Sequence, residues 1–73
     1  HSSFVNHRLD YFETSFEEKG IILLKIWYRE IIETEFTYYP DNPPQQNLYE
    51  QSIYLDYNGN IVEEDSAIFV SKE

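Results

Sequence analysis

Residues 21–38, with the sequence IILLKIWYREIIETEFTY, alternate between two kinds of position. Apart from Glu30, the even positions are apolar or uncharged, namely Ile22, Leu24, Ile26, Tyr28, Ile32, Thr34, Phe36 and Tyr38. The odd positions mix apolar and charged side chains. A period of two residues is typical of a half-buried β-strand. Most strands run about 3–10 residues, so we expect a bend or bulge near Arg29-Glu30, which would also explain the position of Glu30.

A helix within residues 10–36 is the alternative interpretation. Ser15-Phe16-Glu17-Glu18 fits a capping box, and part of the following stretch fits one helical face. Gly20 and the β-branched isoleucines disfavour a helix. We therefore predict a strand and keep an α+β fold as the alternative.

Two turns are expected on either side of this stretch. Asn58-Gly59 tolerates the positive φ angles of a two-residue type I′ turn. That turn would pair Tyr57 with Asn60, Leu55 with Val62, and Ile53 with Glu64. The second turn is Glu17-Glu18-Lys19-Gly20, where Gly20 would supply a left-handed residue.

The remaining segments predict further strands and one loop. Residues 5–16 change the parity of their alternation after Tyr11, which fits either a bulged strand or a short helix opened by Asp10. Residues 40–47 contain three prolines and predict a loop, and residues 67–70 could add a final strand. The fold class is therefore mainly β, with about four antiparallel strands that could curve into a barrel. The predicted core residues are Ile22, Leu24, Ile26, Phe36, Leu55 and Val62.

Length and charge limit what the chain can be. Its 73 residues predict one small domain, 1–73, with a formal net charge of -9. Between Glu30 and Val70 there is no Lys, Arg or His. Such a field repels nucleic acid and anionic membranes and attracts basic partners.

Catalytic, cofactor and metal sites are not expected. There is no cysteine, His7 is the one histidine away from the first residue, and two glycines cannot build a phosphate loop. Residues 56–60 resemble the opening of a calcium loop, but Gly59 is misplaced and Ala67 stands where a bidentate Glu is required. The apolar run Ile21–Leu24 is too short to span a membrane. We expect a cytoplasmic protein that is not an enzyme and has no cofactor.

Carboxylates and tyrosines together indicate a binding function. Tyr offers a large contact area with a polar tip, and a carboxylate can stand in for a phosphate on a basic surface. The predicted partner-binding residues are Glu33, Glu35, Tyr38, Tyr54, Tyr57, Glu63, Glu64 and Asp65.

The expected function is therefore non-enzymatic binding to a basic protein, which could extend to mimicry of DNA or RNA. No motif assigns a family, although the small, acidic, cysteine-free character is similar to that of phage anti-defence proteins, nuclease inhibitors and immunity proteins. The alternative is a structural domain that forms homo-oligomers through an aromatic-rich sheet face. A third reading is a small-ligand module lined by Tyr side chains and Trp27. The geometry of the carboxylates separates the first two, because mimicry requires them on one surface.

Overall fold

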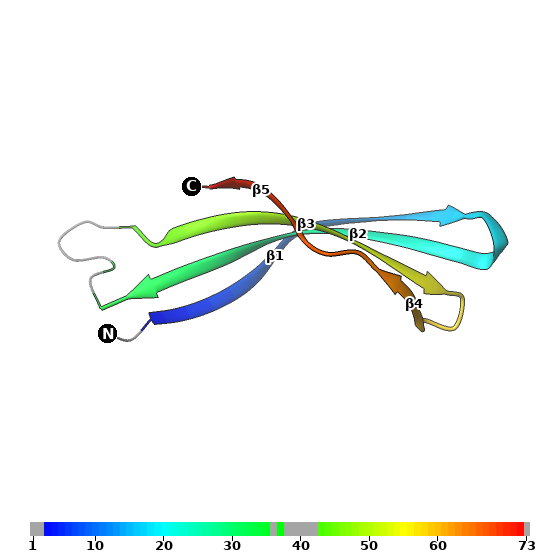
Figure 1. Cartoon of the computed structure of the whole chain (residues 1–73), viewed down its shortest axis with the longest axis horizontal. Coiled ribbons are helices and arrows are strands. Elements are labelled where there is room, and N and C mark those ends of the chain that lie inside the picture. Colours follow the sequence, from blue (N-terminus) through cyan, green and yellow to red (C-terminus); the bar gives the residue numbers. More distant parts are fainter. Residues whose placement is uncertain (1–2, 36, 38–42, 73) are drawn as a thin grey trace.

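Antiparallel strands, three of them long, make up most of the structure (Figure 1). The computed structural model describes residues 3–35, 37 and 43–72. Its elements are β1 (Ser3–Glu17), the 3₁₀ turn η1 (Glu18–Gly20), β2 (Ile21–Thr34), β3 (Gln45–Asp56), β4 (Ile61–Glu64) and β5 (Ile68–Lys72). The predicted mainly β fold is confirmed, and the helical alternative for residues 10–36 is wrong for the residues described.

The sheet has the strand order β1-β2-β3-β4, and β5 also pairs with β3. β4 lies beside residues 53–55 and β5 beside residues 47–50, so the two short strands follow one another along the same edge of β3. All pairings are antiparallel. The sheet stays open and does not close into a barrel.

The bulge lies in β1 and not at the predicted position near Arg29-Glu30. β2 runs without interruption, whereas the register of β1 shifts between Leu9 and Tyr11, which leaves Asp10 as the extra residue. The shift brings Leu9 and Phe12 to the same face of the sheet. β2 needs no irregularity at Glu30 because that carboxylate accepts a hydrogen bond from Asn47 Nδ2 at 3.1 Å. The bulged strand predicted for the N-terminal segment is confirmed.

The turn between β3 and β4 is one residue longer than predicted. The Asn60 carbonyl accepts from the Asp56 amide, and the Asp56 carbonyl accepts from the Gly59 amide. Gly59 has φ +86°, as expected for a three-residue loop that ends in a left-handed residue. Leu55 therefore lies opposite Ile61 instead of Val62, while the predicted pairing of Ile53 with Glu64 is confirmed. The predicted pair of Tyr57 and Asn60 is absent from the described ladder.

The turn between β1 and β2 follows the prediction at Gly20, which has φ +74°. Lys19 is also left-handed, with φ 62°, which was not expected because such a conformation is uncommon outside glycine. Two successive left-handed residues reverse the chain directly into β2.

The proline-rich loop is shorter than predicted. β3 already begins at Gln45, and Gln45 and Asn47 lie opposite Ile32 and Glu30 of β2. The prolines remove hydrogen-bond donors only up to Pro44, so the following amides can enter the ladder. Residues 38–42 lie outside the described residues. The final strand predicted at residues 67–70 is confirmed as β5.

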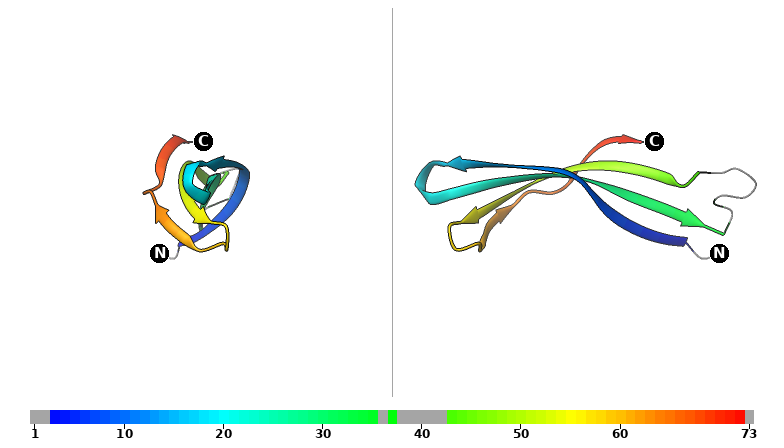
Figure 2. Two further views of the ribbon diagram at one scale, coloured as in Figure 1. Left: turned by 90° about the vertical axis from the view of Figure 1, so that its right-hand side faces the viewer. Right: turned by 180° about the vertical axis from the view of Figure 1, so that it is seen from behind.

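The molecule is a single twisted layer. Its principal extents are 54 × 19 × 15 Å and its radius of gyration is 16.1 Å, against about 11 Å for a compact domain of this length. The left-hand view of Figure 2 looks along the long axis and shows the strands wound around it. Within the described residues, no helix has the length and hydropathy that a membrane crossing requires.

The predicted core is wrong, because no described hydrophobic side chain is buried. Ile22, Leu24, Ile26 and Leu55 are half-buried in the sheet, and Val62 is 57% exposed. Phe36 lies outside the described residues. The alternation in the sequence places side chains on one face correctly, but a single layer supplies nothing to cover that face.

Candidate interaction surface

On β1, β2 and β3, one face of the described sheet has no charged side chain over the part that runs from Leu9 to the η1 turn. In an antiparallel sheet, residues directly opposite one another share a face, so the register of β1, β2 and β3 defines its members. We call it the uncharged face; its residues are Leu9, Phe12, Thr14, Phe16, Ile22, Leu24, Ile26, Tyr28, Tyr49, Gln51, Ile53 and Leu55. Three strands contribute to it, and the bulge at Asp10 is what brings the two halves of β1 onto it.

Aromatic side chains form a continuous row near one limit of this face. The rings of Tyr28 and Tyr49 stack at 5.6 Å between centroids, and Phe69 of β5 meets Tyr49 edge-on at 5.8 Å. The row crosses β2, β3 and β5. It offers flat apolar area with polar tips, the composition that is enriched at protein interfaces.

Polar groups border the uncharged face. Beyond Tyr28, Glu30 accepts from Asn47 and lies 4.0 Å from His7 Nε2. Along the β4 edge, Gln51 Nε2 donates to Glu64 Oε1 and to the Asp65 carbonyl, both at 3.0 Å. An apolar centre with a satisfied polar rim is the common anatomy of a protein–protein interface.

The pKa of Tyr49 reports on this border. Partial burial raises it above 10.0, and the negative charge of Glu30 and the neighbouring Tyr28 raise it further. The direction of this shift agrees with the position of Tyr49 in an apolar row beside a carboxylate.

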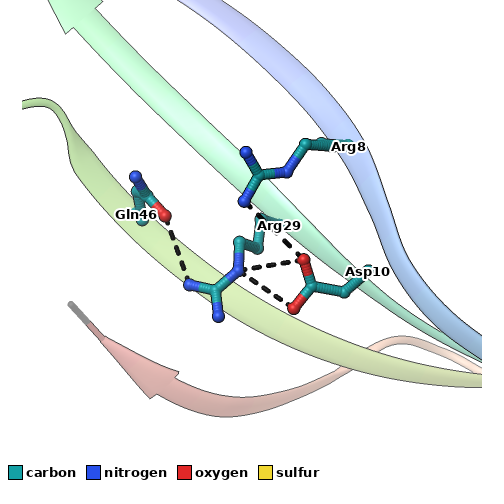
Figure 3. Close-up of polar contacts among 4 residues, drawn as sticks. All are labelled: Arg8, Asp10, Arg29 and Gln46. Carbon is teal, nitrogen blue, oxygen red and sulfur yellow. Dashed lines mark hydrogen bonds and ion pairs between the residues drawn. The ribbon is translucent and has the colours of Figure 1, made fainter.

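The opposite face carries charges, and several of them are paired across strands. Arg29 Nε donates to both carboxylate oxygens of Asp10, at 3.1 and 3.0 Å, and Arg29 Nη1 donates to Gln46 Oε1 at 3.2 Å (Figure 3). Arg8 Nη2 lies 3.7 Å from the same Asp10. The extra residue of the bulge thus serves as the acceptor that joins β1 to β2.

A second polar cluster lies further along the charged face. Trp27 Nε1 donates to Glu50 Oε2 at 2.9 Å, and Lys25 Nζ is 3.5 Å from Glu50 Oε1. Tyr11 packs on Trp27, with ring centroids 5.5 Å apart. Several polar groups of the charged face are therefore hydrogen-bonded or ion-paired within one chain, whereas Phe12 and Phe16 of the uncharged face are more than half exposed.

The exposed surface area shows how much larger the surface of this chain is than that of a compact monomer of the same mass. The chain exposes 5597 Å², while a compact monomer of 8.8 kDa would expose about 4,800 Å². The excess of about 800 Å² equals the area that one partner contributes to an interface of standard size. Phe16 is 78% and Phe12 56% exposed, so much of that excess is apolar.

The residues predicted to bind a partner do not come together on one surface. Glu33 is the last residue but one of β2, and Glu35 follows the strand, near the N-terminal end of the molecule. Tyr57 lies in the turn near the other end (Figure 1). Tyr54 and Glu63 are opposite one another on the charged face, whereas Glu64 lies opposite Ile53 on the other face. Asp65 follows β4, and Tyr38 lies outside the described residues.

The surface that sequence reasoning missed is the β1 part of the uncharged face. Its signal was the change of parity after Tyr11, which puts Leu9, Phe12 and Phe16 on one side once the bulge is taken into account.

Neither a metal site nor a match to a known protein indicates what this surface does. Within the part of the chain that the structure describes, no three His, Cys, Asp or Glu side chains are grouped so that they could hold a metal ion. Comparison with known proteins finds no matching family model, curated protein or solved structure. The physical character of the two faces is therefore the basis for a functional proposal.

Proposed function

We propose that this chain is a self-assembly module, in which copies pack their uncharged faces together to complete a core. The observation that carries the proposal is that no described hydrophobic side chain is buried, while twelve residues on three strands form a face without charge. A sheet that is apolar on one face is stable only when another layer covers that face.

The distribution of charge also supports self-assembly over mimicry of nucleic acid. Mimicry requires a row of carboxylates without basic side chains between them, but on the charged face basic side chains contact them. Asp10 lies 3.0 Å from Arg29 and 3.7 Å from Arg8, and Glu50 lies 3.5 Å from Lys25. Glu30 and Glu64 lie on the other face. Several carboxylates are engaged within the chain, as Asp10 is with Arg29 and Glu50 is with Trp27. Carboxylates that are paired within the chain suit solubility and local stability.

Neighbouring leucines on β2 provide the test. Leu24 belongs to the uncharged face, and Leu23 lies opposite Tyr54 on the charged face. Leu24→Lys places a charge in the proposed interface, so it should abolish assembly in sedimentation equilibrium. Leu23→Lys makes the same chemical change on the same strand and should leave the assembled fraction nearly unchanged.

The melting temperature of the unmodified chain provides a second measurement, which does not depend on a folded variant. A fold completed by a second copy becomes more stable as protein concentration rises. We expect the melting temperature to increase over a hundredfold range of protein concentration. A monomer at all concentrations, with a constant melting temperature, would refute the proposal.

A second candidate function is binding to a basic protein, and one observation favours it. The β3–β4 hairpin brings together Asp56, Glu63 and Tyr54, within a stretch of sequence that lacks any basic residue from 30 to 70. Glu63→Gln together with Glu64→Gln should slow association with such a partner, because the charges steer the encounter. An unchanged association rate would exclude this hairpin as the binding surface.

A further inference from the structure

β1 presents a long edge that no described strand covers. It is the outermost strand of the order β1-β2-β3-β4 and runs from Ser3 to Glu17. The other edge is divided into β4 and β5, with Glu63, Glu64 and Asp65 at the division. Short strands and acidic side chains are known protections against edge pairing. Among the described strands, β1 alone therefore offers a long edge of free backbone donors and acceptors.

We propose that two copies of this chain pair through β1, antiparallel over residues 11–17, about a twofold axis at Thr14. The inference rests on the proposed function, because it takes self-association as given and names a second surface for it. The result is one sheet that continues from one copy into the other.

The bulge sets the limit of this pairing. On the η1 side of Asp10, the residues Phe12, Thr14 and Phe16 lie on the uncharged face; on the other side of Asp10, the same face carries Leu9 and His7. An antiparallel partner without a matching irregularity cannot keep its faces aligned across such a shift. Pairing is therefore confined to residues 11–17, which is a strand of ordinary length.

Charge selects the register within that segment. Centring the pair on Thr14 sets Phe12 opposite Phe16 of the second copy, Glu13 opposite Ser15, and Tyr11 opposite Glu17. Moving the centre to Glu13 places two Glu13 side chains against each other, and moving it to Ser15 places Glu13 against Glu17. Like charges directly opposite are destabilising. The Thr14 register avoids them and also uses all seven residues.

The same register extends the uncharged face. Phe12, Thr14 and Phe16 of both copies lie on one side of the joined sheet, so the apolar surface continues across the boundary. Both Phe rings are more than half exposed in the single chain, and aromatic pairs across strands are favourable. On the charged side, Lys25 of β2 lies opposite Glu13, so a basic residue neighbours that carboxylate in the register.

Disulfide trapping tests the register, because the chain has no cysteine of its own. Thr14→Cys puts two thiols at opposite positions, where Cα atoms are about 4.5–5.5 Å apart, within the range that a disulfide spans. Under mild oxidation we expect a covalent dimer that shifts to twice the mass on a non-reducing gel.

Two matched variants make the result specific. Ser15→Cys alone, or Glu13→Cys alone, would hold its two thiols on Cα atoms about 8 Å apart, since each is displaced by two residues at about 3.4 Å each. Each should cross-link about tenfold more slowly than Thr14→Cys, whereas a mixture of the two should form the heterodimer readily. Equal rates for all three single variants would overturn the proposed register.

Sedimentation of the same samples under reducing conditions separates this inference from the proposed function. A chain that assembles while Thr14→Cys fails to cross-link selectively refutes pairing through β1 and leaves face packing standing. A chain that remains monomeric refutes both.

Discussion

The Arg29 guanidinium joins three strands of a sheet in which no described hydrophobic side chain is buried. It contacts Asp10 on β1 and Gln46 on β3 from its own position on β2, and its side chain is only 16% exposed. Arg8 meets the same Asp10 from the surface at 3.7 Å, with 60% exposure. Asp10 therefore has one largely covered partner, Arg29, and one exposed partner, Arg8. Their contributions to the free energy of unfolding can be compared directly.

Asp10→Ala should lower the free energy of unfolding by about 1–3 kcal/mol, because it removes the acceptor of two charged hydrogen bonds from a largely covered group. Arg8→Ala should cost less than about 0.5 kcal/mol, as is usual for an exposed ion pair. Urea unfolding of both variants at one fixed protein concentration gives the comparison. Equal losses would mean that the Arg29 contact contributes no more than a surface pair.

One carboxylate, at the end of β3, accepts several hydrogen bonds from the β3–β4 turn. Asp56 Oδ1 accepts from the amides of Asn58 and Asn60, both at 2.9 Å, and Oδ2 accepts from Asn60 Nδ2 at 3.2 Å. These bonds, those from Asn60 first, lower the pKa of Asp56 below 3.8. A lowered pKa means that the ionised form stabilises the folded turn.

That contribution should be present above about pH 4 and should be lost as the pH falls through the lowered pKa in the folded state. Asp56→Asn weakens the acceptor without changing its size. The variant should therefore melt at a lower temperature than the unmodified chain at pH 7, and the difference should shrink towards pH 2. A difference that stays constant over this range would show that the charge of Asp56 does not support the turn.

At the level of elements, alternation and turn residues predicted most of the sheet. The period of two residues located β2, the parity change after Tyr11 located the bulged β1, and Gly20 and Gly59 located both turns. The turn length was missed because it depends on Asp56, which satisfies two further amides and allows a third loop residue. The bulge predicted near Glu30 was not needed, because Asn47 on the next strand satisfies that carboxylate.

Burial and site geometry could not be predicted in the same way. Alternation assigns side chains to a face, but whether that face is covered depends on a second layer, and the number of layers is not encoded in a local pattern. The acidic residues predicted to form one binding site share the same chemistry. They nevertheless lie on different faces and towards opposite ends of the sheet. Their separation follows from the length of β2 and β3, which cannot be predicted from a single short motif.

The whole molecule combines an apolar face with a formal charge of -9, and these two properties oppose one another in assembly. Packing of the uncharged faces removes apolar area from water, while the charges of two copies repel. Repulsion of exposed charges is screened by salt, since the Debye length falls from about 10 Å at 0.1 M to about 3 Å at 1 M. The same negative charges attract a basic partner, so screening by salt has the opposite effect on that association.

Salt should therefore strengthen self-association and weaken binding to a basic protein. We expect the dissociation constant of the assembly, measured by sedimentation equilibrium, to fall as NaCl rises from 0.05 to about 0.5 M. Lowering the pH towards the isoelectric point near 4.4 should act in the same direction, because it removes negative charge. Potassium chloride serves as a control, since screening depends on ionic strength and not on the identity of the cation. An assembly that dissociates as chloride is added would contradict packing through the uncharged face, because only attraction between opposite charges weakens in that way.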